Sequence, residues 1–302
     1  MDTIYQPLKI VLIGGNGFIG NAIYEELKSF DFEIIPTSRN INNLGSDFIK
    51  FDLFNENTWK VLLHEIQPDI VICTAWETEH STYWQKNSNF DYAKAIIKFA
   101  TASFSATVNH FICLGSCSEY GFSPGKCNSI TTPLNPQNPY SESKVFASAE
   151  LHAISNKYGK KANWIRLFQP YGLKENPLRL IPSLIMNMSQ DKVININTPN
   201  DMLDFTHISD VAAAIRLIVM GNYNFSVNIG TGIATSISNL TYMLSDILNF
   251  STKKISFNNS TSQLSRSVYV DAQSDILLGI WRPKYDLYSG LLTLITRGYQ
   301  PK

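Results

Sequence analysis

Tyr140 and Lys144 form the residue pair in this sequence whose types and spacing could do chemistry. They lie four positions apart, just after Pro139. Four residues make about one helical turn, so on a helix the phenol and the ammonium share a face. A free tyrosine ionises near pH ~10, and a cation held one turn away should lower that pKa. We therefore predict that Tyr140 exchanges protons near neutral pH.

The segments around this pair predict a helix and a serine able to face it. A surface Tyr and Lys on an amphipathic helix give the same spacing by chance, so the context decides. Pro139 suits a helix start, and the good helix formers that follow continue it. His110 to Leu114 reads as a strand that leads to Ser116. Open α/β sheets bind ligands at such strand ends, so Ser116 could hydrogen-bond a substrate carbonyl rather than be an ordinary turn serine.

A glycine-rich loop near the start of the chain predicts a dinucleotide site. Leu8 to Ile13 reads as a buried strand, and Gly14, Gly17 and Gly20 follow it at the head of a helix pattern. Glycine suits this loop because the backbone turns sharply and a Cβ would block a pyrophosphate. The N–H groups of the helix start would then face the phosphates.

The end of the second predicted strand, Phe32 to Thr37, indicates which dinucleotide binds. An acidic residue there prefers the free 2′-hydroxyl of NAD. This chain has Ser38 and Arg39 instead, and these are donors that suit a 2′-phosphate. A solvated surface arginine is the alternative reading. Given the glycine loop, we predict that NADP(H) is favoured over NAD(H).

Four further stretches follow, two beside the predicted cofactor and two read as loops. Asp52 and Leu53 follow a short third strand, where the adenine edge would fall. Ala75 follows the fourth strand and is small, as close approach of a cofactor requires. Residues 77–86 are polar and irregular and predict an active-site loop, and residues 122–138, rich in Pro, Asn, Ser and Thr, predict a second loop.

Composition limits the function classes. The 302 residues are 44% hydrophobic and 17% charged with zero formal net charge, which predicts a globular protein with a large core. Neutral charge without Lys/Arg runs argues against a nucleic-acid or anionic-membrane binder. No stretch approaches the ~18 apolar residues of a membrane span. Residues 1–12 lack a long apolar run, so we expect no signal peptide and a cytoplasmic location.

The four cysteines do not predict a metal site. Cys73 and Cys113 sit in strand-like runs, which suits buried, reduced thiols. Cys113, Cys117 and Cys127 form a loose cluster, but the sequence shows no CxxC pair and no nearby histidine. We therefore expect no metal.

Taken together, these motifs resemble the extended short-chain dehydrogenase/reductase family, in the branch that acts on nucleotide-diphosphate sugars. The resemblance runs along nearly the whole chain. The matching residues are the first-loop glycines, Asp52-Leu53, Ala75, Asn89, Ser116 with Gly121, Tyr140 with Lys144, residues 166–172, Asp204-Phe205-x-His207-x-x-Asp210 and residues 228–232.

The resemblance implies an α/β fold. A Rossmann doubly wound parallel sheet of about seven strands would occupy residues 1–172 and 204–232. A smaller C-terminal α/β domain, residues 173–203 and 233–302, would bind the sugar nucleotide. The predicted helices 89–102 and 140–158 resemble those that form a four-helix interface in relatives, so a homodimer is expected.

The resemblance also implies roles for individual residues. Tyr140 would protonate a carbonyl oxygen as hydride arrives from the nicotinamide, while Lys144 would lower the phenol pKa and hold the nicotinamide ribose. Ser116 would orient the carbonyl. The implied cofactor-binding residues are Gly14, Gly17, Phe18, Ile19, Gly20, Ser38, Arg39, Asp52, Leu53, Ala75, Asn89, Tyr140, Lys144 and Gln169.

Departures from the family pattern narrow the reaction. The 4,6-dehydratases carry an Asp-Glu pair directly after the serine or threonine, where this chain has Cys117 and Ser118. Neither is a carboxylic acid, so dehydration is not expected. Many relatives also carry an arginine before Asp204, and this chain has Met202-Leu203 there. The substrate-binding candidates are Ser116, Cys117, Ser118, Arg179 and Arg266, the two arginines being alternatively plain surface residues.

The leading hypothesis is an NADPH-dependent reductase of a nucleotide-linked 4-keto-6-deoxy sugar, which would make a deoxyhexose for a surface polysaccharide. It depends on Ser38 and Arg39, because a net consumer of reductant usually draws on NADPH. An NAD-dependent 4-epimerase shares every catalytic residue and is the nearest alternative. A non-catalytic dinucleotide sensor is a third, against which the joint presence of Ser116, Tyr140 and Lys144 argues.

Overall fold

The computed structural model describes residues 6–42, 44–77, 79, 82–258 and 265–298, and the chain forms two compact units. The first unit comprises residues 1–119, 136–166 and 212–227. The second comprises residues 120–135, 167–211 and 228–302. These units divide the chain differently from the expected domains, because residues 120–135, 167–172, 204–211 and 228–232 belong to the second unit.

A seven-stranded sheet underlies the first unit. Its strand order is β12-β7-β5-β4-β1-β2-β3, so the predicted Rossmann sheet is confirmed. β1 pairs in parallel with both β2 and β4, and the strand order therefore reverses beside β1, where open α/β sheets bind ligands. The strands are β1 (Leu8–Ile13), β2 (Phe32–Ser38), β3 (Ile49–Lys50), β4 (Ile70–Cys73), β5 (His110–Ser116), β7 (Lys161–Leu167) and β12 (Val227–Ile229).

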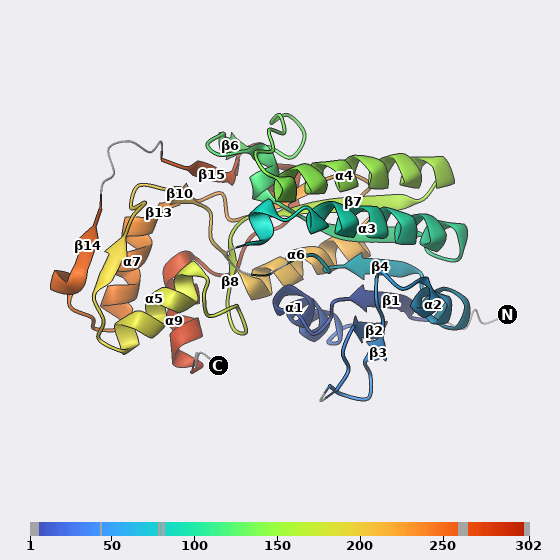
Figure 1. Cartoon of the computed structure of the whole chain (residues 1–302), viewed down its shortest axis with the longest axis horizontal. Helices are drawn as coiled ribbons and strands as arrows, with labels where there is room; N and C mark the ends of the chain where they lie inside the picture. Colours follow the sequence, from blue (N-terminus) through green and yellow to red (C-terminus); the bar gives the residue numbers. More distant parts are fainter. Residues whose placement is uncertain (1–5, 43, 78, 80–81, 259–264, 299–302) are drawn as a thin grey trace. The chain divides into compact units, whose positions relative to one another are not determined.

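Helices connect these strands, and two of them pack along each other, α3 and α4 (Figure 1). Their inner faces bury apolar side chains such as Phe99, Ala147 and Leu151 in one core with the sheet. The helices are α1 (Phe18–Leu27), α2 (Glu56–Lys60), which continues as a π-helix over Val61–Ile66, α3 (Ser88–Ser105), α4 (Pro139–Tyr158) and α6 (Ile208–Met220).

Helix α4 begins where the sequence predicts, and local capping explains why. The Asn138 side chain accepts a hydrogen bond from the Ser141 N–H (3.0 Å), and the Ser141 hydroxyl accepts one from the Asn138 N–H (3.3 Å). This reciprocal pair satisfies donors that a helix start leaves free, and Pro139 fills the first turn without needing a partner. Tyr140 and Lys144 therefore lie on the first two turns of a firmly started helix.

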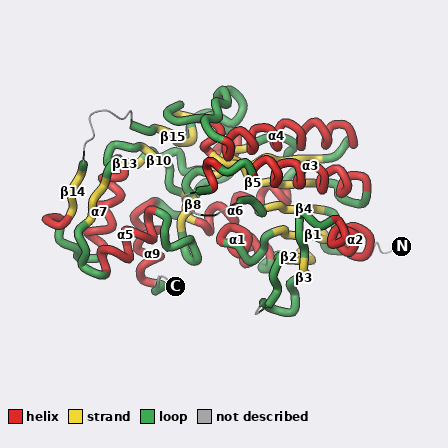
Figure 2. The backbone as a smooth tube through the Cα atoms, viewed as in Figure 1, coloured by secondary structure: helices red, strands yellow, loops and turns green. Residues whose placement is uncertain are grey.

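The second unit contains short strands and several helices, of which α5, α7 and α9 gather together (Figure 2). Its four-stranded sheet has the order β13-β10-β15-β6, and two-stranded pairs join β8 to β11 and β9 to β14. The elements are β6 (Gly125–Cys127), β8 (Pro170–Tyr171), α5 (Leu180–Ser189), β9 (Ile194–Ile196), β10 (Met202–Leu203), β11 (Thr206–His207), β13 (Thr235–Ser236), α7 (Ile237–Ile247), β14 (Ile255–Phe257), β15 (Ser267–Val270), α8 (Ile276–Ile280) and α9 (Leu287–Thr296).

Strand β6 departs from the expectation of a loop over residues 122–138. It pairs in parallel with β15, far along the chain, with Cys127 opposite Val270. The segment has no alternating pattern of its own, so its strand depends on the partner. Elsewhere in this unit the buried Asp204 carboxylate accepts the N–H groups of Thr231, Gly232 and Val270, which ties the loop after β12 to β15.

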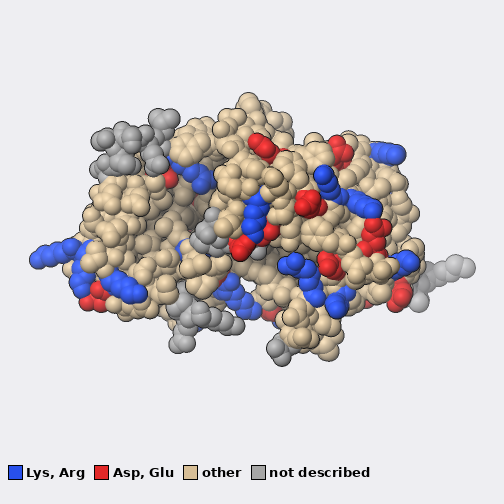
Figure 3. All heavy atoms as spheres, viewed as in Figure 1, with Lys and Arg blue, Asp and Glu red and all other residues tan. Residues whose placement is uncertain are grey.

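The surface carries charges of both signs. On the face drawn in Figure 3, Lys and Arg side chains lie scattered among Asp and Glu. Among the described helices, none combines the length and the apolar character that crossing a membrane requires.

We predict that buried His110 makes the fold sensitive to acid. Burial lowers the pKa of His110 from 6.5 to about 4, against a hydrogen bond with Asn163 that raises it. Between these pH values the unfolded chain binds a proton that the folded chain does not, so stability falls as pH falls from 6.5 to 4. The full shift corresponds to about 3 kcal/mol.

Substituting His110→Gln keeps a donor for Asn163 but removes this titration. Urea unfolding should therefore show a smaller loss of stability between pH 6.5 and 4.5 than in the original protein, by about 2 kcal/mol. The control is His64→Gln, since His64 is exposed. An H110Q protein that loses stability as steeply as the original would contradict the prediction.

Candidate active site

The loop between β1 and α1 can accept a diphosphate. Gly14 has a φ of +81°, which strains any residue with a side chain. A Cβ on Gly20 would lie 2.1 Å from the Gly14 carbonyl oxygen, so the helix start approaches the loop as only glycine allows. No side chain caps the helix at Gly17, and the first N–H groups of a helix have no partner within it. Phe18 and Ile19 therefore present N–H groups suited to phosphate oxygens.

The end of β2 carries the predicted adenosine-side residues. Ser38 is buried and its hydroxyl donates to the Asn40 carbonyl (2.8 Å), whereas Arg39 is exposed. After β3, the Asp52 carboxylate accepts the Phe54 N–H (3.0 Å), and Leu53 is buried. At the end of β2 the Arg39 side chain therefore reaches solvent, whereas the Ser38 hydroxyl hydrogen is used within the protein.

Ser116 ends β5, and a tight 3₁₀ turn, Cys117–Tyr120, follows it. The Ser116 hydroxyl oxygen accepts hydrogen bonds from the Ser118 N–H (3.2 Å) and the Ser118 hydroxyl (2.9 Å). With its oxygen engaged, the Ser116 hydroxyl can donate its own hydrogen. Cys117 is buried. Both the N–H and the hydroxyl of Ser118 donate to the Ser116 hydroxyl oxygen.

Tyr140 faces Ser116 and is covered by aromatic rings. The rings of Tyr83 and Trp84 meet it edge-on, with centroids 4.9 and 5.0 Å away. Burial raises the pKa of Tyr140, Tyr83 adds to this, and the hydrogen bond with Ser116 opposes it. The pKa of Tyr140 is therefore raised and not lowered as predicted, because desolvation of the phenolate is the largest effect.

Lys144 points into the interior beside Tyr140 rather than at its hydroxyl. Its ammonium donates to the Leu114 carbonyl (2.6 Å) and lies 3.7 Å from the centroid of the Trp76 ring. The centroid of the Tyr140 ring is 5.5 Å away. Burial lowers the pKa of Lys144 to about 8, against the raising effects of Cys113 and Glu119. The amine therefore titrates close to physiological pH.

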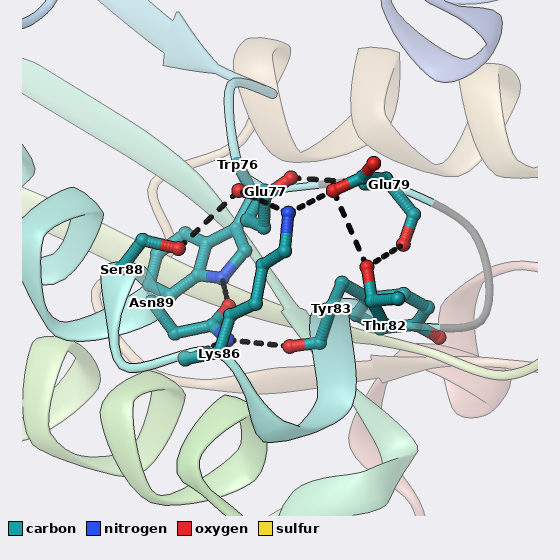
Figure 4. A network of polar contacts seen from close by, with 8 residues as sticks. All are labelled: Trp76, Glu77, Glu79, Thr82, Tyr83, Lys86, Ser88 and Asn89. Carbon is teal, nitrogen blue, oxygen red and sulfur yellow. Dashed lines mark hydrogen bonds and ion pairs between the residues drawn. The ribbon is translucent and has the colours of Figure 1, made fainter.

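The segment that carries Tyr83 and Trp84 is tied down by Asn89 (Figure 4). The Asn89 side-chain oxygen accepts from the Trp76 indole N–H (2.8 Å). Its amide donates to the carbonyls of Tyr83 (2.6 Å) and Lys86 (2.7 Å). Both amide hydrogens are thus used within the protein, and Asn89 anchors the loop. Its contact with a cofactor stays a prediction.

Charges add to this network. Lys86 pairs with Glu79 and Glu77, and the Ser88 hydroxyl donates to Glu77 (3.3 Å) (Figure 4). The predicted irregular loop 77–86 contains a 3₁₀ turn, Tyr83–Gln85, while residues 78, 80 and 81 lie outside the described part. Tyr83 and Trp84 are aromatic residues in an otherwise polar stretch, and this was the sequence signal that they pack against Tyr140.

The remaining predicted residues lie in the second unit or at its edge. Gln169 has a φ of +25°, a strained backbone for a residue with a side chain. Arg179 precedes α5 and lies 3.7 Å from Glu175. The Arg266 N–H donates to the Asp201 carboxylate (2.8 Å). Both arginines belong to the second unit and Ser116, Tyr140 and Lys144 to the first, so their role toward a diphosphate stays a prediction.

The cysteines are buried free thiols, as expected of Cys73 and Cys113. Within the described ranges, no group of three or more His, Cys, Asp or Glu side chains is placed to hold a metal ion. The first unit offers groups for acid–base chemistry: the phenol of Tyr140 with a raised pKa, the Ser116 hydroxyl beside it and the Lys144 amine with a pKa lowered to about 8.

Known proteins share this fold and much of the sequence pattern. The chain is 24% identical to a putative UDP-glucose 4-epimerase of Methanocaldococcus jannaschii, over 95% of this chain and 97% of that protein. It is 26% identical to a GDP-6-deoxy-D-talose 4-dehydrogenase of Aggregatibacter actinomycetemcomitans, over 80% of each. The structure of dTDP-glucose 4,6-dehydratase from Bacillus anthracis in complex with NAD matches with a TM-score of 0.81, at 22% identity and 96% coverage of both chains.

The family-level comparison covers more than the glycine loop. The sequence model described as the NAD dependent epimerase/dehydratase family matches residues 10–230, from β1 to the end of β12. That span contains the loop after β1, Ser116, Tyr140 and Lys144. The chain therefore belongs to the NAD dependent epimerase/dehydratase family.

Proposed function

We propose that this protein is a nicotinamide-dinucleotide-dependent reductase of a nucleotide-linked 4-keto-6-deoxy sugar. The observation that carries the proposal is the partly buried Tyr140 beside Ser116, whose raised pKa favours the neutral phenol. A reduction needs a proton donor at the start, and this phenol is one. The named relatives and the dehydratase structure share position 4 of a nucleotide-linked hexose in their names, which supports the carbonyl position.

Each residue has a role in this proposal. When bound, the nicotinamide supplies the hydride. Ser116 donates a hydrogen bond to the substrate carbonyl oxygen and so places it against Tyr140, which transfers its proton to that oxygen. Lys144 stabilises the negative charge left on the phenolate oxygen, since a nearby ammonium favours phenolate. The N–H groups of the loop after Gly14 hold the diphosphate of the dinucleotide.

A 4,6-dehydratase is not favoured, although such an enzyme shares the fold. Dehydration needs an acid and a base beside the sugar, and the two residues after Ser116 are a buried thiol and a hydroxyl that donates to Ser116. Neither is a carboxylic acid. The site retains the redox residues without the groups that would eliminate water.

A 4-epimerase is the second candidate. The putative UDP-glucose 4-epimerase of Methanocaldococcus jannaschii matches nearly the full length of this chain, which favours it. An epimerase must first remove a proton from a hydroxyl, and the partly buried Tyr140, whose pKa is raised, is less suited to that first step than to donation. The reductase is therefore preferred.

The proposed function is tested by assaying NADPH and NADH oxidation against 4-keto-6-deoxy sugars linked to dTDP, GDP, CDP and UDP. A reductase consumes one equivalent of reduced dinucleotide for each sugar and forms a deoxyhexose. Protein that carries tightly held NAD⁺ through purification and interconverts hexoses without consuming dinucleotide would replace the reductase with the epimerase.

Substituting Tyr140→Phe should separate an enzyme from a dinucleotide sensor. The change removes the proton donor and keeps the ring contacts, so kcat should fall by ~10²–10⁴-fold, while dinucleotide affinity, measured by fluorescence titration, stays within about threefold. Gly20→Ala is the contrasting variant, because its Cβ meets the Gly14 carbonyl at 2.1 Å, and it should lose dinucleotide binding. Full turnover in Y140F would exclude Tyr140 as the acid.

Substituting Arg39→Asp tests the preference for NADPH. Loss of a charged hydrogen-bond partner costs ~1.5–3 kcal/mol, so NADPH affinity should fall by roughly 10–100-fold. NADH lacks the 2′-phosphate, and its affinity should change by less than about threefold. The control Lys28→Ala removes an exposed cation at the other end of α1. Original protein that binds NADH as tightly as NADPH, by calorimetry, would disprove the preference.

A further inference from the structure

Glu119 is a fully buried carboxylate directly behind Ser116. Its side chain is 0% exposed. One carboxylate oxygen accepts the Ser116 N–H (2.8 Å) and the Trp164 indole N–H (2.9 Å). The other accepts the Arg166 Nε–H at 2.7 Å. Three donors from β5 and β7 therefore converge on one carboxylate in the first unit.

The contact with the Ser116 N–H closes the turn in which Ser116 lies. The Glu119 side chain accepts the N–H of the residue three positions before it and so holds the Ser116 backbone in place. The direction of the Ser116 hydroxyl therefore depends on the position of the Glu119 carboxylate. The adjoining Gly115 shows how tightly this is packed. A Cβ there would lie 2.2 Å from the Trp164 indole nitrogen and 2.5 Å from the Glu119 carboxylate.

The pair with Arg166 is also buried, with side chains 5% and 0% exposed. A buried ion pair is weak evidence for stability, because desolvating two charges offsets most of their attraction. An apolar pair of the same volume would hold β5 and β7 together as well. Packing alone therefore does not require a charge at Glu119, and we looked to the neighbouring Tyr140 and Lys144 for its effect.

We propose that Glu119 is a positioning residue that orients Ser116 through the Ser116 N–H and places a buried negative charge beside Tyr140 and Lys144. The proposal goes beyond the reductase function, and its activity readout rests on that function. Its spectroscopic readout does not, so failure of the two can be told apart.

The groups around the pair agree with this role. The Lys144 ammonium lies 5.7 Å from the centroid of the Trp164 ring, whose indole N–H donates to Glu119. Cys113, Glu119 and Cys73 are the groups that raise the pKa of Lys144. Tyr83, Ser116, Glu119 and Cys117 face Tyr140, and Glu119 raises its pKa as well. Glu119 is the carboxylate common to both sets. Its negative charge opposes formation of phenolate and favours ammonium.

Substituting Glu119→Gln removes the charge and keeps the shape. The titration of Lys144, followed by the ¹⁵N resonance of its amine and assigned by comparison with Lys144→Met, should move to lower pH by about one unit, as expected for loss of a nearby opposite charge. The alkaline limb of the kcat–pH profile should move the same way. Glu119→Asp keeps the charge but shortens the reach to Ser116, so it should lower kcat by about tenfold and leave the titration in place.

Two further variants complete the test. Glu119→Gln with Arg166→Met avoids leaving one buried charge unpaired, which can unfold a protein, and should shift the Lys144 titration downward as well. Glu26→Gln breaks the less buried ion pair with Arg216 in the same unit and should move nothing. If both charge-removing variants lose stability or kcat while Lys144 titrates as in the original protein, Glu119 has a purely structural role and the proposal is overturned.

Discussion

The buried ammonium of Lys144 is the interaction on which the rest of the site depends. A cation removed from water must be held by acceptors, because its desolvation is otherwise too costly. The Leu114 carbonyl supplies one acceptor, and the rings of Trp76 and Trp164 lie around it at 3.7 and 5.7 Å from their centroids. These partners belong to β5, the residues after β4, and β7. Holding this one charge therefore places residues of β5, of β7 and of the segment after β4 against the start of α4.

Desolvation shifts the pKa values of Tyr140 and Lys144 in opposite directions. It raises the pKa of Tyr140 and lowers that of Lys144, so each is driven toward its neutral form. A site that starts with a neutral phenol is prepared to give up a proton. The edge-on rings of Tyr83 and Trp84 contribute to this burial, and Asn89 holds them there. Loop anchoring and proton chemistry are thus coupled through burial.

Two buried carboxylates organise the chain in contrasting ways. Asp204 in the second unit is satisfied mainly by backbone N–H groups, of Thr231, Gly232 and Val270. Such a carboxylate shapes a loop and needs no counter-charge. Glu119 in the first unit accepts one backbone N–H and is otherwise held by Trp164 and Arg166. The difference in partners fits a structural task for the first and an electrostatic one for the second.

The sequence by itself determined the features whose causes are local. Apolar runs marked the strands of the Rossmann sheet, the glycines after β1 marked a turn that tolerates no side chain, and Pro139 marked the start of α4. Only the tertiary structure decided the direction of the Tyr140 pKa, the inward role of Asn89, the pairing of β6 with β15 and the place of Glu119 behind Ser116. The physical reason is the separation along the chain between the groups that interact. Spacing along a helix shows which charges are neighbours, but desolvation and hydrogen-bond partners depend on segments that come together only when the chain is folded.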